Sequence, residues 1–458
     1  MPTGPLPRAV RVGYALGSVA TGSFATVPGL LLLPYLTDRL GVRAGLAGLI
    51  VLLPKAWDVV LNPIAGRISD RSTHPDGRRR PFLLRAGLLL AVLFVALFSG
   101  PTGPVAVAAA WVVVAFVGCA SAYAFFQVPY VAMPAELTGD YGERTRLMTW
   151  RVAVLALAIL VSGGLAPVVR DGLGPTWGYR GVGLFVGLLI AGGAVGAWRG
   201  TAGAAYDTGP SAGAGLGEQL RLVARHRDFR LLLATFVVQA LATGCMLAGV
   251  DYVATWVVGR KGAATVLFLC FVAPALVVSP AWQAVGARIG KKAGFVAASL
   301  VLFAGAVGVY AARGPTLVPL AVAVALVGIG YAGAQMFPLA MLADVAAVDA
   351  ARTGQNRIGV FTGVWTGAET LGLALGPGLY AAVLASGGYV SSTGGAVSQS
   401  ASAVSAIGLG FSLVPAVLIL LSLAFLRGYH LDEALVRAAG SGIPAGRTGD
   451  GLDERGFP

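Results

Sequence analysis

Long apolar runs recur along the entire chain and are separated by short polar segments. A membrane-spanning helix needs about 20 mostly apolar residues. Runs near that length cover residues 13–36, 45–66, 82–100, 104–130, 150–170, 180–198, 229–257, 263–286, 293–312, 316–342, 359–386 and 403–426. We therefore predict an all-α membrane protein with twelve transmembrane helices.

The composition favours a membrane protein over a soluble one. Hydrophobic residues make up 57% of the chain and charged residues 12%, about half the charged share of a typical soluble domain. The net charge of +13 would also suit a nucleic-acid binder, but the basic residues fall in short segments between apolar runs. We therefore expect the lipid bilayer as a partner and no nucleic acid.

Basic residues gather in every second connection between the apolar runs, at 67–85, 144–151, 199–230, 288–292 and 352–357. The connections at 99–104 and 386–402, on the other side, have no charge. Cytoplasmic connections of membrane proteins carry an excess of Lys and Arg. We therefore predict a multi-pass protein of the plasma membrane with both termini in the cytoplasm.

An internal repeat divides the chain into two halves. The sequence QVPYVAMPAE at 127–136 recurs as QMFPLAMLAD at 335–344, an offset of 208 residues (335 − 127). Two parallel six-helix repeats are the plan of the major facilitator transporters, which bind their substrate between the halves. We predict pseudo-symmetric six-helix bundles at 1–198 and 229–428, a cytoplasmic connection at 199–228 and a disordered cytoplasmic tail at 429–458.

Ionisable residues inside apolar runs are the leading candidates for a functional site, because a charge at bilayer depth is costly unless it is paired or solvated. Asp58 lies near the middle of the second run, with Lys55 one turn before it and Asn62 one turn after it. This group can form a cation or proton site that also contacts a solute, or a structural Lys–Asp pair. We favour the functional site.

Two motifs indicate a family. Residues 57–81 read WDVVLNPIAGRISDRSTHPDGRRRP, and residues 128–151 read VPYVAMPAELTGDYGERTRLMTWR. Both resemble the glycoside–pentoside–hexuronide:cation symporter (melibiose-permease-like) family of the major facilitator superfamily. The resemblance extends over all twelve predicted helices.

The resemblance implies a coupling ion at Asp58, which matches the first of two helix-2 acids that bind the cation in that family. The second acid is Asn62 in this chain. One negative charge and one oxygen ligand are thereby lost, and Na⁺ prefers oxygen ligands. We therefore expect coupling to H⁺ more than to Na⁺, with no other cofactor and no resident metal.

The resemblance also implies a solute site. Arg151 matches the sugar-site arginine of the family, but the two carboxylates that recognise the sugar fall at about Gly22 and at Gln127. Recognition of a galactoside in the usual way is therefore not expected, and the solute is another glycoside or not a sugar. The predicted substrate-binding residues are Lys55, Asp58, Gln127, Arg151, Asp251 and Trp365.

Two further acids lie in apolar runs. Glu369 is in the eleventh predicted helix and is a second coupling group, together with Asp58 and Asn62, or a partner of Lys55 or Arg151. The alternative is a helix-end carboxylate near water, which its distance of ten residues from the start of the span at 359 disfavours. Asp251 is near the outer end of the seventh helix. It is a substrate contact, an outer gate or a water-exposed interfacial acid.

A third group of charges matches the cytoplasmic gate motif of the facilitator fold. Acids at helix ends can pair with arginines and hold the two halves together on the cytoplasmic side. The alternative is a positive-inside charge pattern without a gating role. The predicted gate comprises Asp70, Arg71, Arg78, Glu136, Arg144, Asp344 and Arg352.

We predict a monomeric secondary transporter that couples symport of a small polar solute, such as a sugar or glycoside, to a cation by alternating access. The alternative within transport is a proton-driven exporter of a hydrophobic or natural-product molecule. A membrane enzyme would need paired acids, a His/Asp pair or a cysteine site, and the sequence shows none of these. A non-transporting receptor of the same fold would need no acid at the midplane.

Overall fold

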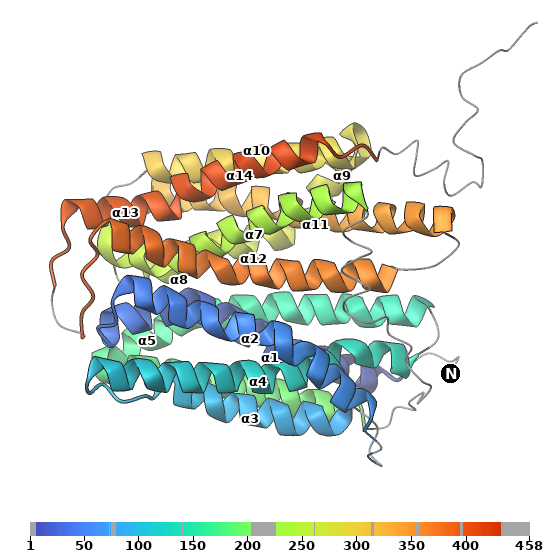
Figure 1. The fold of residues 1–458 in the computed structure, drawn as a ribbon, viewed down its shortest axis with the longest axis horizontal. Helices are drawn as coiled ribbons and strands as arrows, with labels where there is room; N and C mark the ends of the chain where they lie inside the picture. Colours follow the sequence, from blue (N-terminus) through green and yellow to red (C-terminus); the bar gives the residue numbers. More distant parts are fainter. Residues whose placement is uncertain are drawn as a thin grey trace, which may run out of the picture.

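The structure is a computed structural model that describes residues 6–431, apart from residues 73, 75–78, 139–140, 203–225, 261, 313–315, 354–357 and 394–396. In this part of the chain, all regular secondary structure is helical (Figure 1). The elements are α1 (Arg8–Pro34), η1 (Tyr35–Arg39), α2 (Ala44–Asp70), α3 (Arg80–Phe98), α4 (Val105–Leu137), α5 (Tyr141–Gly200), α7 (Arg227–Tyr252), η2 (Val253–Val258), α8 (Ala263–Val277), α9 (Ser279–Ile289), α10 (Lys291–Ala311), α11 (Leu317–Thr353), α12 (Ile358–Ser386), α13 (Ala401–Phe411) and α14 (Leu413–Arg427).

α5 folds back on itself near its middle. A straight helix of its 60 residues would measure about 90 Å, three times the hydrocarbon thickness of a bilayer. Gly174 interrupts the helix with φ 73° and ψ −175°, and Pro175 follows. A Cβ atom on Gly178 would lie 2.4 Å from the carbonyl oxygen of Arg170, so the residues after the break pack against those before it. The predicted spans 150–170 and 180–198 fall on either side of this break.

The expectation of an all-α membrane protein is confirmed, whereas the number twelve stays a prediction. Among the described residues, 9 helices are long and apolar enough to cross a bilayer, or 10 if α8 and α9, which meet at a 53° bend, form one span. Arg146–Gly200 counts once in this total although it contains the Gly174 break. α2 (Ala44–Asp70) enters this count only with Ala44–Pro54, because several residues that follow in the helix lie outside the described part.

Two helices extend well beyond the apolar runs that predicted them. α4 continues to Leu137 rather than ending near 130, and α11 continues to Thr353 rather than ending near 342. Backbone hydrogen bonds can continue through polar residues once a helix leaves the apolar layer, so hydropathy underestimates helix length there. These extensions include the two copies of the repeated motif.

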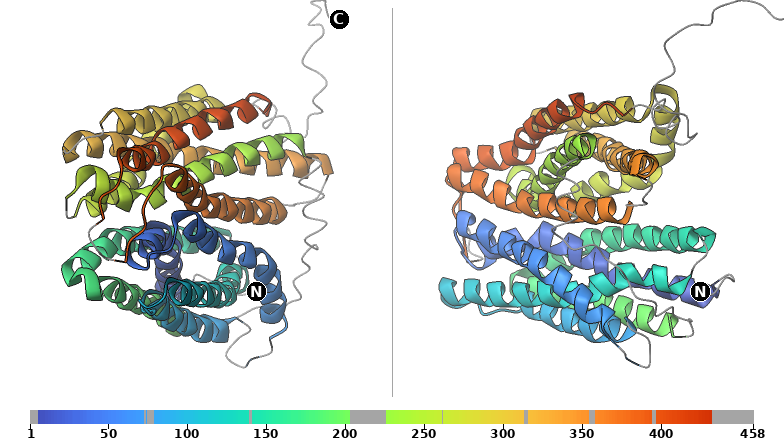
Figure 2. Two further views of the ribbon diagram at one scale, coloured as in Figure 1. Left: turned by 60° about the vertical axis from the view of Figure 1, so that its left-hand side comes forward. Right: turned by 45° about the vertical axis from the view of Figure 1, so that its right-hand side comes forward.

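The helices form two bundles that lie side by side. Figure 1 shows α1–α5, in blue to green, below α7–α14, in green to red, and Figure 2 shows the same division from two other directions. Within the first bundle α1 packs on α5 so closely that a Cβ on Gly13 would lie 2.3 Å from Gly200. The central connection and the tail fall almost entirely outside the described residues.

Among the described residues, the bundles meet mainly through α2 with α12, α5 with α8, and α1 with α7, and α1 also contacts α12. One end of the molecule carries η1 and the connection from α12 to α13, and we call it the Asp38 end (left in Figure 1). The opposite end carries Arg71, Arg146 and Lys291, and we call it the basic end.

Candidate functional site

Asp58 lies in a polar cluster inside the first bundle. Its side chain is buried on α2, and only 6% of the residue is exposed. Tyr123 on α4 lies within electrostatic range of both Asp58 and Arg151, which is on α5. Two of the predicted site residues, from different helices, therefore lie in the vicinity of the same tyrosine.

Hydroxyl and amide groups of α1 and α4 complete this cluster. Thr21 Oγ donates a hydrogen bond to Gln127 Oε1 over 2.7 Å. Tyr130 OH donates to the carbonyl oxygen of Tyr14 over 2.8 Å and lies 2.9 Å from Ser18 Oγ. Gln127, where the family resemblance places a sugar-binding acid, is thus an uncharged acceptor held by a threonine.

Arg151 is the cation of the cluster. Its Cζ lies 5.6 Å from the centre of the Tyr130 ring, and its buried Nε–H has no hydrogen-bond partner among the described residues. No described carboxylate forms an ion pair with it. A partly buried guanidinium without a carboxylate is a site at which an anion can bind.

The position of the missing helix-1 acid is filled by the protein itself. A Cβ on Gly22 would lie 3.0 Å from the Cβ of Ala158 and 3.1 Å from the carbonyl oxygen of Leu155, both on α5. Even a Cβ at this position would require its neighbours on α5 to move by a few tenths of an ångström. The close approach of α1 and α5 therefore leaves little room for the sugar-binding acid of the family at Gly22.

The second bundle contains a matching but uncharged pair. Gln335 Nε2 donates to Tyr331 OH over 2.8 Å, and Glu369 on α12 lies within electrostatic range of that tyrosine. Tyr331 and Gln335 stand 208 residues after Tyr123 and Gln127 (331 − 123 and 335 − 127). Each bundle thus places a tyrosine, a glutamine four residues later and one acid together.

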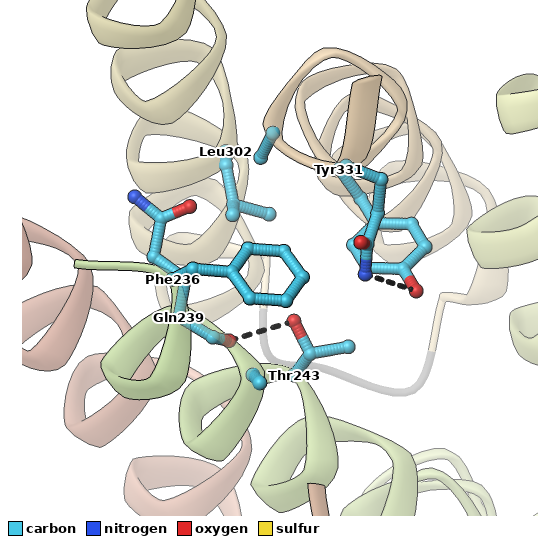
Figure 3. A pocket seen from close by; sticks show the side chains of 8 residues that line it. Phe236, Gln239, Thr243, Leu302 and Tyr331 are labelled. Atoms are coloured by element: carbon cyan, nitrogen blue, oxygen red, sulfur yellow. Dashed lines mark hydrogen bonds between the residues drawn. The ribbon is translucent and has the colours of Figure 1, made fainter. Parts of the chain in front are cut away.

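A small cavity lies beside this pair, between α7, α10 and α11 (Figure 3). Phe236, Gln239 and Thr243 line it from α7, opposite Tyr331 and Gln335. Its free space admits about one water molecule, so it is too small for a sugar in this conformation.

Trp365 lies behind this cavity. Its ring stacks on Phe236 with 4.4 Å between ring centres, and only 1% of the residue is exposed. A direct substrate contact of Trp365 stays a prediction.

Asp251 joins the two bundles near the Asp38 end. Arg170 of α5 donates from Nη1 to Asp251 Oδ2 over 2.6 Å, and its Nε lies 2.9 Å from Asp171 Oδ1. Beside this pair, Thr37 Oγ lies 2.6 Å from Tyr252 OH of the other bundle. This geometry favours the gate interpretation of Asp251, and the substrate contact stays a prediction.

Much of the predicted gate at the basic end lies outside the described part of the chain. This applies to Arg78 and to the side chains of Asp70, Glu136 and Arg144. The side chain of Lys55, a predicted substrate-binding residue, lies outside the described part as well. Arg71 and Arg352 are exposed, and Asn62 in the coupling site is exposed as well. Asp344 accepts hydrogen bonds of 2.6 Å from Lys291 Nζ, a partner within its own bundle that the sequence did not suggest.

Sequence reasoning also missed Glu143. This buried carboxylate accepts hydrogen bonds from Arg146 over 3.0 Å and from the backbone N–H of Leu6 over 3.2 Å. Its position has no acid in the second repeat, where residue 351 is alanine, so the internal repeat could not reveal it.

Between described residues, the hydrogen bonds and ion pairs that join the two bundles all lie in the half nearer the Asp38 end. Among all described residues, no group of three or more His, Cys, Asp or Glu side chains could hold a metal ion. The polar cluster around Asp58 and Arg151 lies outside the region in which these hydrogen bonds and ion pairs connect the bundles.

Comparison with known proteins relates the chain to a family of transporters. A family described as "MFS/sugar transport protein" matches residues 13–433. YagG of Escherichia coli (strain K12), provisionally named a glycoside/cation symporter, is 32% identical over 156 residues, and the match spans 34% of each chain. A glucuronide carrier protein homologue of the same organism is 24% identical over 92% of both chains.

The fold also matches a solved structure. A bacterial homologue of the human lysosomal transporter Spinster, in an inward-facing and unoccupied conformation, has a TM-score of 0.64 at 14% identity. The match covers 95% of this chain and 97% of that one. At this identity the likeness concerns the fold alone.

Proposed function

Because the chain belongs to the glycoside–pentoside–hexuronide:cation symporter family of the major facilitator superfamily, we propose that it is a secondary transporter that couples symport of a small polar solute to a cation. The observation that carries the proposal is buried Asp58 sharing a polar cluster with Arg151. A buried acid and a partly buried cation, on different helices of one bundle, provide separate sites for the ion and the solute.

We favour H⁺ over Na⁺ as the coupling ion. The second helix-2 acid of the family is replaced by Asn62, which is uncharged and exposed. A single carboxylate can bind a proton without further ligands, whereas Na⁺ requires several oxygens. Protonation would remove a charge at bilayer depth and so lower the cost of moving between the two faces.

We propose that the basic end faces the cytoplasm, because positive residues concentrate there. The Asp38 end then faces outward, and the polar contacts between the bundles at that end support an inward-facing state. The Arg170–Asp251 pair would be an outer gate that must separate when the site opens to the outside.

The solute that fits best carries hydroxyl groups and an anionic group. Thr21, Gln127 and Tyr130 offer hydrogen bonds to hydroxyl groups, and Arg151 has no ion-pair partner among the described acids. A carboxylate would pair with Arg151 in a bidentate manner. One relative is named for glucuronides, which are acidic sugar derivatives. This name supports an anionic solute over a neutral galactoside.

Transport in proteoliposomes tests the proposal. An imposed pH gradient should drive uptake of a hydroxylated acid such as a glucuronide, with co-movement of protons detected by an internal pH dye. Asp58→Asn should abolish gradient-driven accumulation while solute counterflow continues, which would show that the variant is folded. Unchanged accumulation in Asp58→Asn would contradict coupling at this residue.

Proton-driven export is the second candidate, because the acids at the Gly22 and Gln127 positions are missing. Vesicles of both orientations separate the two directions. Export would appear as solute accumulation in inside-out vesicles, driven by a proton gradient directed outward from the vesicle interior.

A further inference from the structure

The 389–392 segment of the second bundle lies against the first bundle at the Asp38 end (Figure 1). The chain leaves α12 through Gly388, whose φ of 75° suits glycine rather than other residues. From there the segment reaches the turn between η1 and α2, about 350 residues earlier in the sequence.

Backbone carbonyl groups form most of the surface that receives this segment. The last carbonyl groups of a helix have no donor within the helix. The N–H of Ser392 donates to the carbonyl of Thr37 over 2.8 Å, and its Oγ donates to the carbonyl of Asp38 over 3.0 Å. Ser391 Oγ donates to the carbonyl of Val42 over 2.7 Å. The segment thus supplies donors that the end of η1 lacks.

Tyr389 adds a side-chain contact to the same surface. Its hydroxyl donates to Asp38 Oδ1 over 2.6 Å and accepts a 2.9 Å hydrogen bond from Trp256 Nε1 of its own bundle. Thr37 Oγ also lies 2.9 Å from Asp38 Oδ1. A continuous line of hydrogen bonds therefore runs from η2 through Tyr389 to a carboxylate of the first bundle.

The shape of the segment is fixed from within the second bundle. Gln399 accepts a hydrogen bond from the N–H of Val390 over 3.0 Å and donates to its carbonyl over 2.7 Å. On the opposite side, a Cβ on Gly41 would lie 2.8 Å from Thr393 Cγ2, so the receiving turn needs glycine for this close approach.

We propose that the 389–392 segment closes the Asp38 end and sets how readily the two bundles separate there. The inference rests on alternating access, but not on the identity of the solute or the ion. Separation requires all four hydrogen bonds to the first bundle to break. One such bond typically changes an equilibrium constant about five-fold. Water can replace these bonds at an exposed end, so the contact is reversible.

A distance measurement on the purified protein tests this directly. Spin labels at Thr102→Cys and Arg260→Cys, both exposed and in different bundles at the Asp38 end, report the separation after the native cysteines are replaced by alanine. The triple variant Tyr389→Phe/Ser391→Ala/Ser392→Ala should increase the long-distance population at least ten-fold. Ser386→Ala is the matched control, since its Oγ donates to the carbonyl of Val383 in its own helix.

Two further variants separate closure from stability. Gln399→Ala should give a smaller increase in the long-distance population, because Gln399 holds the segment from within its own bundle. Tyr389→Phe alone serves if the triple variant does not fold, and it should raise that population a few-fold. A distance distribution unchanged from the wild type, in either the triple variant or a folded Tyr389→Phe variant, would overturn the proposal. This experiment measures no transport, so its outcome does not depend on whether the proposed symport is correct.

Discussion

Arg151 distinguishes the two half-sites. Tyr123 with Gln127 near Asp58, and Tyr331 with Gln335 near Glu369, are two versions of one arrangement. Only the first bundle adds a guanidinium at the repeat-related position. Position 359, which is 208 residues after Arg151, is a glycine. The difference in charge between the half-sites supports the proposal that an anionic solute binds in the first bundle.

Replacement of Arg151 tests that assignment. Arg151→Gln should raise the KM for an anionic solute about 10- to 100-fold, because a charge-assisted hydrogen bond contributes about 1.5–3 kcal/mol. Arg151→Lys should recover part of the affinity, since the charge remains but the planar donor pair is lost. Uptake kinetics of a glucuronide and of the matching neutral glucoside provide the measurement. An equal loss for both solutes would rule out charge recognition.

At the scale of one element, the reversal within α5 depends on the backbone conformation of Gly174. Gly174 has φ 73° and ψ −175°, a region that is almost exclusive to glycine. Two residues earlier, Gly172 is helical, and a Cβ added there would meet no atom within 4 Å. The backbone at position 174 therefore requires glycine, whereas the helix at position 172 can accept alanine.

Alanine substitution at these two sites gives a matched pair. Gly174→Ala should destabilise the fold by about 1–3 kcal/mol because of backbone strain. Gly172→Ala should be neutral or stabilising by up to about 1 kcal/mol, because alanine favours a helix. Thermal unfolding of the detergent-solubilised protein compares the two. Similar melting temperatures for both variants would show that the turn does not depend on the conformation of Gly174.

At the scale of the whole molecule, the two bundles are joined by polar contacts at the Asp38 end, within the described residues. Arg170 and Asp251 are both largely buried, with 16% and 5% of their side chains exposed. A buried charge whose partner is removed is strongly unfavourable. Removing only one of the two residues is therefore expected to destabilise the closed state of the Asp38 end.

Removal of the cation should open the Asp38 end. Arg170→Gln leaves Asp251 buried without its cation, so cysteine-directed labelling of sites between the bundles from that side should increase several-fold. Arg170→Gln/Asp251→Asn should return labelling toward the wild-type rate, because the second change removes the unpaired charge. Labelling that rises further in the double variant would contradict this account.

Several site residues could be predicted from the sequence, and others could not. Asp58 and Arg151 stand out because charge in an apolar run is a local signal. The Tyr123–Tyr331 match was also available from the repeat offset, although the predicted site did not include it. The Asp344–Lys291 pair was not accessible, because an exposed helix end offers several cations at similar distance and packing selects one of them.

The sequence by itself determined the membrane-spanning helices, the repeat and the acid at position 58, because hydrophobicity, periodicity and charge are properties of neighbouring residues. Only the tertiary structure decided that Arg170 pairs with Asp251, 81 residues away, and that α5 fills the space beside Gly22. It also decided which end of the two bundles is closed. These outcomes depend on how closely separate helices approach, and that is set by packing of the whole molecule rather than by any one segment.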